Sequence, residues 1–443
     1  MEYQSVGQGG GAPDTLPVPP ALDLPAPDRR FSAEAMRRKV KVLFVVSQPT
    51  GSPALAVHAN LMRLLNRDRV EVHVLYNVLA EGEPYRSAGT SVLDILPERE
   101  DLHLRPGVFG PVGGAPPRRL LASAARSLGP ALRDSAALVR YIRRHRIDII
   151  HCEEGPRNAF YALLLARITP AKSVVHFHSK YGSWMSPLSR LGVRHADAII
   201  AVSSWTGRVI HEAGVPRERI FPVLNGIDVT GWDPATIDGD GVRREFGLGP
   251  QAPLIVMVAQ LVAWKRQTTL IEAFRRVAAA YPDARLLIVG REFKPDPAPG
   301  ELTVEQQLRR QVTEAGLDEQ VTFAGQRRDV RQILAAADVF AHPSVDDPCP
   351  MAHIEAMAMA TPVAAVQAGG APELVAHGQT GLLSPADDSG ALADNLMALI
   401  GDPDRRQAMG ERGRARVLEY LNLKRVTDDV EGVYRLAAGL ASV

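Results

Sequence analysis

Residues 338–363 read Asp338-Val-Phe-Ala-His-Pro-Ser-Val-Asp-Asp-Pro-Cys-Pro-Met-Ala-His-Ile-Glu-Ala-Met-Ala-Met-Ala-Thr-Pro-Val363. An apolar strand is expected to end at His342, followed by a Pro-rich loop and a helix over about 351–360. Asp347 lies in the loop and Glu355 on the helix. The start of a helix favours an anion such as phosphate, because its first backbone N–H groups are free and its dipole is positive there. The stretch therefore predicts a buried parallel strand with an anion-binding loop at its carboxyl end.

Strand-like and helix-like segments alternate over the rest of the chain. Such alternation indicates βαβ units around a parallel sheet. The pattern pauses at 225–250, where glycines and prolines mark a connection, and a second series then begins. The fold class predicted is α/β, with two doubly wound, Rossmann-like parallel sheets that face a central cleft. The predicted strands are 39–47, 70–76, 148–152, 173–178, 198–202 and 220–223, then 254–259, 285–289, 321–323, 339–342 and 363–366.

Four parts of the chain follow from this pattern. Residues 1–37 hold clustered Gly and Pro without apolar periodicity, which is typical of a disordered arm, either a passive tail or a docking peptide. Residues 38–225 and 226–415 are the two domains. Residues 416–443 form a C-terminal helix that is a candidate to pack back on the first domain. The helices expected at this end are 389–400, 404–420 and 424–440.

Composition excludes several classes of protein. Hydrophobic residues make up 46% and charged residues 23%, with 51 Lys+Arg against 50 Asp+Glu, which is neither a disordered composition nor one that favours nucleic acid. Two cysteines exclude a disulfide framework and a cysteine-based zinc site. No apolar run is long enough to span a membrane, and the start Met-Glu-Tyr-Gln lacks the features of a signal peptide. We expect a cytoplasmic protein.

Nucleotide-binding motifs of two common kinds are absent from the sequence. Neither domain has Gly-x-Gly-x-x-Gly after its first strand, and there is no Gly-x4-Gly-Lys-Ser/Thr, so a dinucleotide dehydrogenase or a P-loop enzyme is disfavoured. Open α/β sheets bind ligands at the carboxyl ends of their strands. Gly51, after the first strand, is a candidate acceptor-side position or a simple turn residue.

The quoted stretch, together with other segments in the same order, resembles the retaining glycosyltransferases of family 4, which have the GT-B fold. In that family Asp-Val-Phe-x-x-Pro-Ser precedes two glutamates separated by seven residues. The resemblance covers roughly residues 39–420. The further landmarks are Asn225-Gly-Ile-Asp228, Leu261 to Lys265, Leu287-Ile-Val-Gly290, Val321-Thr-Phe-Ala-Gly325, and Gly369-Gly370-Ala-Pro-Glu373 followed by Gly378-Gln-Thr-Gly-Leu382.

The resemblance implies a hexosyltransferase-like enzyme that moves a sugar from a nucleotide diphosphate sugar, UDP- or GDP-linked, to an acceptor hydroxyl with retention of configuration. It implies no cofactor and no metal, with the nucleotide sugar as co-substrate. Asp238-Gly-Asp240 lies in the Gly-rich connection and is therefore interpreted as a turn. The acceptor, a saccharide or a lipid-linked molecule, is not named by the sequence. No residue stands out as a covalent nucleophile, and the resemblance implies front-face attack with the diphosphate oxygen as base.

Three residues of the donor side match family positions. Glu355 resembles the second glutamate, which accepts hydrogen bonds from the ribose hydroxyls. Asp347 replaces the first glutamate, which contacts the transferred sugar, and is one methylene shorter. Lys265 matches the lysine that offsets charge on the departing diphosphate. Lys265, Asp347 and, from the first domain, His178 are the predicted catalytic residues.

Two departures from the family affect the same region. Gln260 stands where the family usually has an arginine for the diphosphate. Pro348 and Pro350 carry no N–H, so backbone contacts to the donor must come from Met351, Ala352 or the helix start. The predicted donor-binding set is Gln260, Lys265, Gly290, Gln326, Asp347, Met351, Ala352 and Glu355.

On the first domain, Ser173-Val-Val-His-Phe-His-Ser179 resembles the strand that delivers a histidine toward the sugar. His178 fits this role better than His176, which lies deeper on the same strand face; the alternative is a structural histidine. Glu153, and beside it Glu154, follow another strand and are candidates to face the acceptor.

Positive charge gathers between Arg105 and Arg146, where nine arginines and one acid give a net charge of +8. An amphipathic helix around Leu120 would suit an anionic membrane surface, and a solvated face with a mobile loop is the equal alternative. Peripheral contact with the membrane inner face is therefore one hypothesis. A second open hypothesis, motivated by Gln260, Asp347 and the two prolines, is a weak or inactive nucleotide-sugar-binding protein. An epimerase of the same fold is disfavoured by Asn225-Gly-Ile-Asp228.

Overall fold

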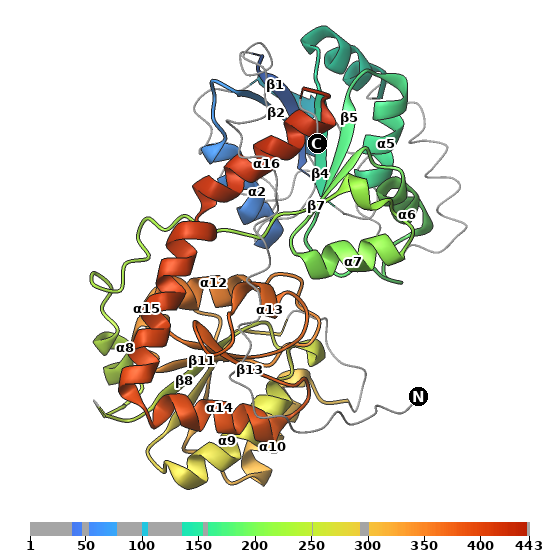
Figure 1. Cartoon of the computed structure of the whole chain (residues 1–443). Coiled ribbons are helices and arrows are strands. Elements are labelled where there is room, and N and C mark those ends of the chain that lie inside the picture. The colour runs from blue at the N-terminus through green and yellow to red at the C-terminus, as the bar shows by residue number, and fades with distance from the viewer. Residues whose placement is uncertain are drawn as a thin grey trace, which may run out of the picture.

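A computed structural model of the chain describes residues 38–46, 53–77, 100–104, 135–153, 158–249, 251–292 and 301–440. Two α/β domains lie one above the other and are joined by the long C-terminal helices (Figure 1). The expected arm at 1–37 lies outside the described residues.

The first domain is built on a parallel seven-stranded sheet with the order β3-β2-β1-β4-β5-β6-β7. Branched apolar side chains fill its central strands, as expected of strands covered on both faces. The strands are β1 Val40–Val46, β2 Val70–Asn77, β3 Glu100–Leu104, β4 Ile149–Glu153, β5 Lys172–Phe177, β6 Ala198–Ala201 and β7 Ile220–Pro222.

Helices cover both faces of this sheet. One core lies between the sheet and the helices α2 (Pro53–Leu64) and α16 (Leu423–Ala437). The other core contains residues of the helix over 135–145 and of α5 (Asn158–Ile168), α6 (Pro187–Arg194) and α7 (Ser204–Glu212). Alternate residues of one strand therefore enter different cores: Val174 packs toward α2 and α16, and Val175 toward α5 and α6.

The second domain repeats this plan with a parallel six-stranded sheet of order β10-β9-β8-β11-β12-β13. Its strands are β8 Leu254–Val258, β9 Arg285–Val289, β10 Val321–Gly325, β11 Val339–His342, β12 Val363–Val366 and β13 Gly381–Ser384. Its helices are α8 Asp240–Glu245, α9 Gln267–Ala280, α10 Val304–Glu314, α11 Val330–Ala336, α12 Met351–Ala358, α13 Ala371–Leu374, α14 Ser389–Ile400 and α15 Pro403–Tyr420.

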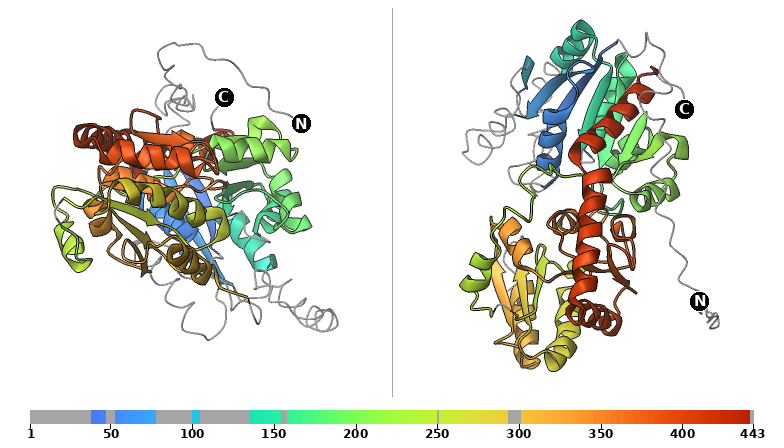
Figure 2. Two further views of the ribbon diagram at one scale, coloured as in Figure 1. Left: turned by 90° about the horizontal axis from the view of Figure 1, so that it is seen from below. Right: turned by 60° about the vertical axis from the view of Figure 1, so that its left-hand side comes forward.

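The chain crosses between the domains twice, and the two crossings pair with each other. Ile227 N donates to Leu421 O at 3.0 Å, and Leu423 N donates to Ile227 O at 2.8 Å. Helix α15 runs unbroken through residues 415 and 416, after which α16 returns to the first domain and buries Val430 and Tyr434 there (Figure 2). The last helix thus belongs to the first domain in space although it ends the chain.

The predicted fold class, two doubly wound parallel sheets, is confirmed, and every predicted strand is present. Two strands were not predicted. β3 (Glu100–Leu104) has the polar sequence Glu-Asp-Leu-His-Leu, β13 has only two apolar residues in Gly-Leu-Leu-Ser, and each lies at the edge of its sheet. Neither carries the long apolar run that marks a buried parallel strand.

Candidate active site

The loop between β11 and α12 carries Asp347 and is held by two glycines. Gly370 N donates to Asp347 O at 2.8 Å, and a Cβ on Gly370 would lie 1.9 Å from Pro348 O. Gly369 has a φ of +59°, which also favours glycine. The Gly369-Gly370 landmark is therefore a steric requirement: only glycines allow this close approach, which places the Asp347 side chain.

Lys265 and Asp347 form a partly buried ion pair, with 12% and 11% of their side chains exposed. Lys265 ends the short 3-10 helix Ala263–Lys265 after β8, and its Nζ lies 4.1 Å from the centroid of the Trp264 ring. Two predicted catalytic residues, 82 positions apart, are thus brought into direct contact at the carboxyl edge of the second sheet. An anion that approaches this edge would compete with Asp347 for the ammonium group.

A pair of buried histidines lies beneath this ion pair. His342 Nδ1 is 3.0 Å from His353 Nε2, and His342 Nε2 is 3.9 Å from Asp347 Oδ2. Burial, and next the positive charge of Lys265, lower the pKa of both imidazoles, that of His353 to about 3. Both rings are therefore neutral at physiological pH and add no positive charge beside Lys265.

Glu355 lies on α12, one turn beyond the helix start, and is partly buried. Desolvation raises the pKa of its carboxyl group to about 7, although the nearby Arg331 acts in the opposite direction. A carboxylate that is costly to ionise gains from hydroxyl donors that stabilise its charged form. The environment of Glu355 suits a group that receives two hydroxyls of a ligand.

The start of α12 offers backbone N–H groups without a capping side chain. Pro350 occupies the N-cap position and makes no side-chain cap, so Met351 and Ala352 present the first N–H groups of the helix. The prolines at 348 and 350 lie just outside the helix, where a missing N–H costs no helical hydrogen bond.

The other predicted donor-binding residues differ in their environment. Gln260 and Gln326 are exposed after β8 and β10, and Gln260 O accepts a 2.8 Å hydrogen bond from Gln267 Nε2. Gly290 has a φ of +144°, and a Cβ there would lie 1.8 Å from Ala259 O. The close approach of the β8 and β9 loops therefore explains glycine at 290 without a donor.

His178 lies in a group of four histidines on the first domain. Its Nε2 is 3.0 Å from His58 Nε2, and its ring stacks on His176 with centroids 4.2 Å apart. His151 lies 5.0 Å from His58, centroid to centroid. Burial, and next the charge of the neighbouring histidines, lower the pKa of His151, His176 and His178 well below the usual value. His178 is therefore a neutral imidazole at the carboxyl end of β5.

Several first-domain predictions fall outside the described structure. Gly51 and Glu154 are not described, and for Glu153 only the backbone, at the end of β4, is described. Of the basic segment, residues 105–134, with Leu120, also lie outside, whereas Arg140, Arg143, Arg144 and Arg146 are within it.

Direct contacts join the two domains beside the site. The Glu373 carboxylate accepts hydrogen bonds from the backbone of Ser204 at 2.7 Å and of Trp205 at 2.8 Å, which are the first two N–H groups of α7. Lys180 Nζ pairs with Asp346 at 2.7 Å, one residue before Asp347. The start of α7 is thus capped by a carboxylate from the other domain, a favourable contact with the helix dipole.

Removal of this carboxylate is expected to loosen the two domains. Glu373→Ala removes two charge-assisted hydrogen bonds of about 1.5–3 kcal/mol each, so more open arrangements should gain population. Small-angle X-ray scattering should show a larger radius of gyration than for the wild-type protein. Glu411→Ala, at an exposed residue of α15, is the matched control, and a Glu373→Ala profile that superimposes on the wild type would contradict this role.

Four residues of this region were missed from sequence. His58 and His353 lie on helices within otherwise apolar faces and give no local signal, and Trp264 was not singled out beside Lys265. Glu373 was noted only as part of a landmark. Its partners are 169 and 168 positions away, so its contact depends on how the domains meet.

Two family profiles match the chain, one for each domain. The family described as Glycosyltransferase Family 4 matches residues 55–230, and Glycosyl transferases group 1 matches residues 240–416. The second match contains Lys265, Asp347 and Glu355, and the first contains His58 and His178.

Curated relatives show similarity over both domains. The chain is 33% identical over 296 residues to the GDP-mannose-dependent monoacylated alpha-(1-6)-phosphatidylinositol monomannoside mannosyltransferase of Corynebacterium glutamicum, which covers 63% of this chain and 74% of the relative. It is 34% identical over 263 residues to the alpha-maltose-1-phosphate synthase of Mycolicibacterium smegmatis, covering 57% of this chain and 66% of that protein.

Solved structures share the two-domain arrangement. The crystal structure of Anabaena HepE in complex with UDP superimposes with a TM-score of 0.70 at 22% identity, over 89% of this chain and 98% of that one. At this identity the match shows a shared fold, and the family follows from the profiles and the relatives. The chain belongs to the family 4 glycosyltransferases, which have the GT-B fold.

Proposed function

We propose that this chain transfers a sugar from a nucleotide diphosphate sugar to an acceptor hydroxyl, with retention of anomeric configuration and without a metal ion. The observation that carries the proposal is the cluster at the carboxyl edge of the second sheet. There Lys265 and Asp347 form an ion pair beside the uncapped start of α12, which carries Glu355. A cation, free N–H groups and a carboxylate are the groups needed for a diphosphate and a ribose diol.

Donor binding is proposed to rearrange the ion pair. The diphosphate takes the Lys265 ammonium and the N–H groups of Met351 and Ala352, and Glu355 accepts the ribose hydroxyls. Asp347, released from Lys265, is then available to a hydroxyl of the transferred sugar. Gln260 and Gln326, both exposed at the ends of neighbouring strands, complete the proposed donor side.

The transfer step breaks the bond between C1 of the sugar and the diphosphate oxygen. The acceptor oxygen forms the new bond to C1 from the same face, and its proton goes to the departing diphosphate oxygen. Lys265 stabilises the negative charge that grows on this leaving group. His178, a neutral imidazole, is proposed to hydrogen-bond a hydroxyl of the sugar from the first domain.

The base of the donor is proposed to be uracil or guanine. One relative is named as GDP-mannose-dependent, and the structural neighbour HepE was solved with UDP. These names support both donor classes equally. The proposed location is the cytoplasm, where nucleotide sugars of both classes would be available.

A panel of radiolabelled nucleotide sugars tests the proposed activity. The purified chain is incubated with each donor and with soluble or lipid-linked acceptors, and release of nucleoside diphosphate is followed. Release that depends on an acceptor, with an α-linked product from an α-linked donor, would support the retaining transferase, and activity that survives EDTA would support metal independence. Donor binding without release for any acceptor would favour the alternative, an inactive nucleotide-sugar-binding protein.

Exposed side chains on helices α5 and α6 of the first domain favour peripheral contact with a membrane. Five large apolar side chains are exposed on α5, on α6 and just before α6, and these helices pack against each other. Residues 158–196 hold five Lys and Arg and no acidic residue, and Arg143 of the preceding helix donates to Ile168 O at 2.8 Å. We name this surface the apolar-basic face: Leu164, Ile168, Trp184, Leu188 and Leu191 with Arg143, Arg144, Arg167, Arg190 and Arg194.

Such a face combines the two attractions that hold a protein on an anionic bilayer. Exposed Leu, Ile and Trp insert at the interface, and each nearby basic residue adds about 1 kcal/mol. No helix among the described residues is both long enough and apolar enough to cross a membrane. We propose that the apolar-basic face rests on the inner face of an anionic membrane.

Co-sedimentation with phosphatidylglycerol vesicles tests this contact. The wild-type protein is expected to bind these vesicles and to bind phosphatidylcholine vesicles at least about tenfold more weakly, because about 1 kcal/mol per basic residue is lost. Leu188→Ser/Leu191→Ser should abolish binding, whereas Leu418→Ser, at an equally exposed leucine on α15, should not. Equal binding of the double variant and the wild type would contradict the assignment of this face.

A further inference from the structure

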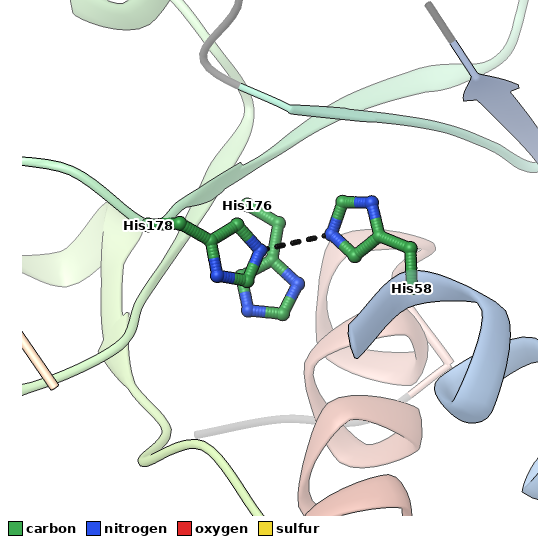
Figure 3. A group of neighbouring side chains, drawn as sticks. All are labelled: His58, His176 and His178. Atoms are coloured by element: carbon green, nitrogen blue, oxygen red, sulfur yellow. Dashed lines mark hydrogen bonds between the residues drawn. The ribbon is translucent and has the colours of Figure 1, made fainter. Parts of the chain in front are cut away.

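Three imidazoles converge at the carboxyl edge of the first sheet. His176 is on β5 and His178 follows two positions later, so both side chains point toward the same face of the sheet. His58 comes from α2, the helix that covers this face. In Figure 3 the rings of His176 and His178 lie side by side, with His58 opposite them.

The geometry of these rings is close to that of a metal site. One nitrogen from each ring lies within 4.8 Å of the other two, and the two Nε2 atoms of His58 and His178 are 3.0 Å apart. Ligand atoms around a tetrahedral zinc ion with Zn–N of about 2.0–2.1 Å are roughly 3.3 Å apart. Side-chain rotations that move these nitrogens by an ångström or so would therefore place all three around one ion.

An unsatisfied nitrogen in this cluster is a second, independent observation. His176 is 3% exposed, and within the described part of the chain its Nδ1 is buried without a hydrogen-bond partner. Nitrogens in this position are usually paired, since an unpaired buried polar atom costs about 1–3 kcal/mol. Coordination of a metal ion would satisfy such a lone pair.

The surroundings hold the rings in place. His151 lies 5.0 Å from His58 and 5.5 Å from His176, centroid to centroid, and its Nδ1 is 2.9 Å from the Tyr434 hydroxyl of α16. Phe44 of β1 packs on His151 with centroids 4.7 Å apart. His151, held by Tyr434 and Phe44, therefore packs against two of the three imidazoles and limits their movement.

We infer that His58, His176 and His178 bind one divalent transition-metal ion of the zinc class, with a fourth position left for water. Three imidazole nitrogen ligands and no carboxylate favour zinc, copper or nickel over magnesium and calcium. The ion would be coordinated by the His178 imidazole, which in the proposed function hydrogen-bonds a hydroxyl of the sugar. Zinc is therefore expected to inhibit transfer, and this consequence alone rests on the proposed function.

Metal binding by the full chain can be measured without any enzyme assay. The protein is stripped with chelator, and Zn²⁺ is titrated by calorimetry. We expect one tight equivalent in the wild-type protein and at least about a hundredfold weaker binding in His58→Phe, which keeps an aromatic ring in the buried position. His195→Ala removes an exposed histidine at the end of α6 and is the matched control, with unchanged affinity expected.

X-ray absorption at the zinc edge provides a second readout. Three imidazole nitrogens at about 2.0–2.1 Å are expected in the wild-type complex. His178→Gln changes the ligand on the other side of the cluster and provides a second test in case His58→Phe does not fold. Circular dichroism checks the fold of each variant. The site would be overturned if both His58→Phe and His178→Gln bound zinc as tightly as the wild-type protein does. It would also be overturned if the folded wild-type protein bound no tight equivalent of zinc. Loss of zinc inhibition in a folded His58→Phe enzyme would support the proposed competition at His178.

Discussion

Replacement of Lys265 by alanine is expected to lower turnover by about 100-fold to 1,000-fold, as found when one preorganised group that stabilises a leaving oxygen is removed. His342 and His353 beneath Lys265 are neutral and cannot replace its charge. No arginine stands at Gln260 to share this task. The loss should therefore appear in kcat for the best donor of the panel.

The design of this experiment must separate catalysis from folding. Lys265→Ala leaves the Asp347 carboxylate without its ion-pair partner and with 11% of its side chain exposed, which destabilises the loop. Lys265→Ala/Asp347→Asn removes both charges and should restore the melting temperature without restoring kcat. Arg266→Ala is the matched control, because Arg266 pairs at 2.9 Å with the exposed Asp387. A folded Lys265→Ala protein with a kcat within about threefold of the wild type would refute the leaving-group role.

Donor affinity is expected to rise with pH through the titration of Glu355. Desolvation raises the pKa of this carboxyl group to about 7 in the free protein, and only the ionised form accepts hydrogen bonds from both ribose hydroxyls. Between pH 8 and pH 6 the ionised fraction falls from about nine-tenths to about one-tenth, so affinity should fall roughly tenfold. Above pH 8 it should be constant.

Calorimetric titration with an intact nucleotide sugar measures this effect. The sugar diester is preferred to the free diphosphate, whose terminal phosphate itself titrates near pH 6. Glu355→Ala should bind more than tenfold more weakly at pH 8, the loss of one charge-assisted bond, and Glu355→Gln should remove the pH dependence. An affinity that is unchanged in Glu355→Ala, or an equal pH dependence in Glu355→Gln, would show that Glu355 does not hold the ribose.

The same pKa has a consequence for stability. A carboxyl group whose pKa is raised in the folded state binds more protons there than in the unfolded chain, so its contribution to stability decreases as pH rises from about 4.5 to about 7. At the pH where donor binding is strongest, burial of the ionised Glu355 therefore lowers the stability of the donor-free protein relative to the unfolded chain. Ribose hydroxyls would recover part of this cost on binding.

Much of the fold could be predicted from local sequence because its strands are buried on both faces. A continuous run of branched apolar residues, such as Val40–Val46 or Val363–Val366, has few other stable environments. Strand β3 was missed because Glu-Asp-Leu-His-Leu has no such run, and β13 because Gly-Leu-Leu-Ser has only two apolar residues and neither is branched at Cβ. The two helix-covered sheets then follow from the order of the segments.

The candidate donor site could be predicted only as separate positions. Lys265, Asp347 and Glu355 were identified from their places after strands and at a helix start, and by their resemblance to the family. The pairing and the ionisation of these side chains were not predicted. The ion pair between Lys265 and Asp347 joins residues 82 positions apart, and the raised pKa of Glu355 depends on its burial. Gly290, expected to contact the donor, has a steric reason of its own.

The sequence by itself determined the two parallel sheets, the edge of each sheet at which chemistry lies, and the family, because these depend on local patterns and on motif order. Only the tertiary structure decided which side chains meet. It placed His58 beside His178, 120 positions away, and capped α7 with Glu373, 169 positions from Ser204. Such contacts depend on how helices pack on a sheet face and how two domains approach each other, and periodicity along the chain carries no information about either.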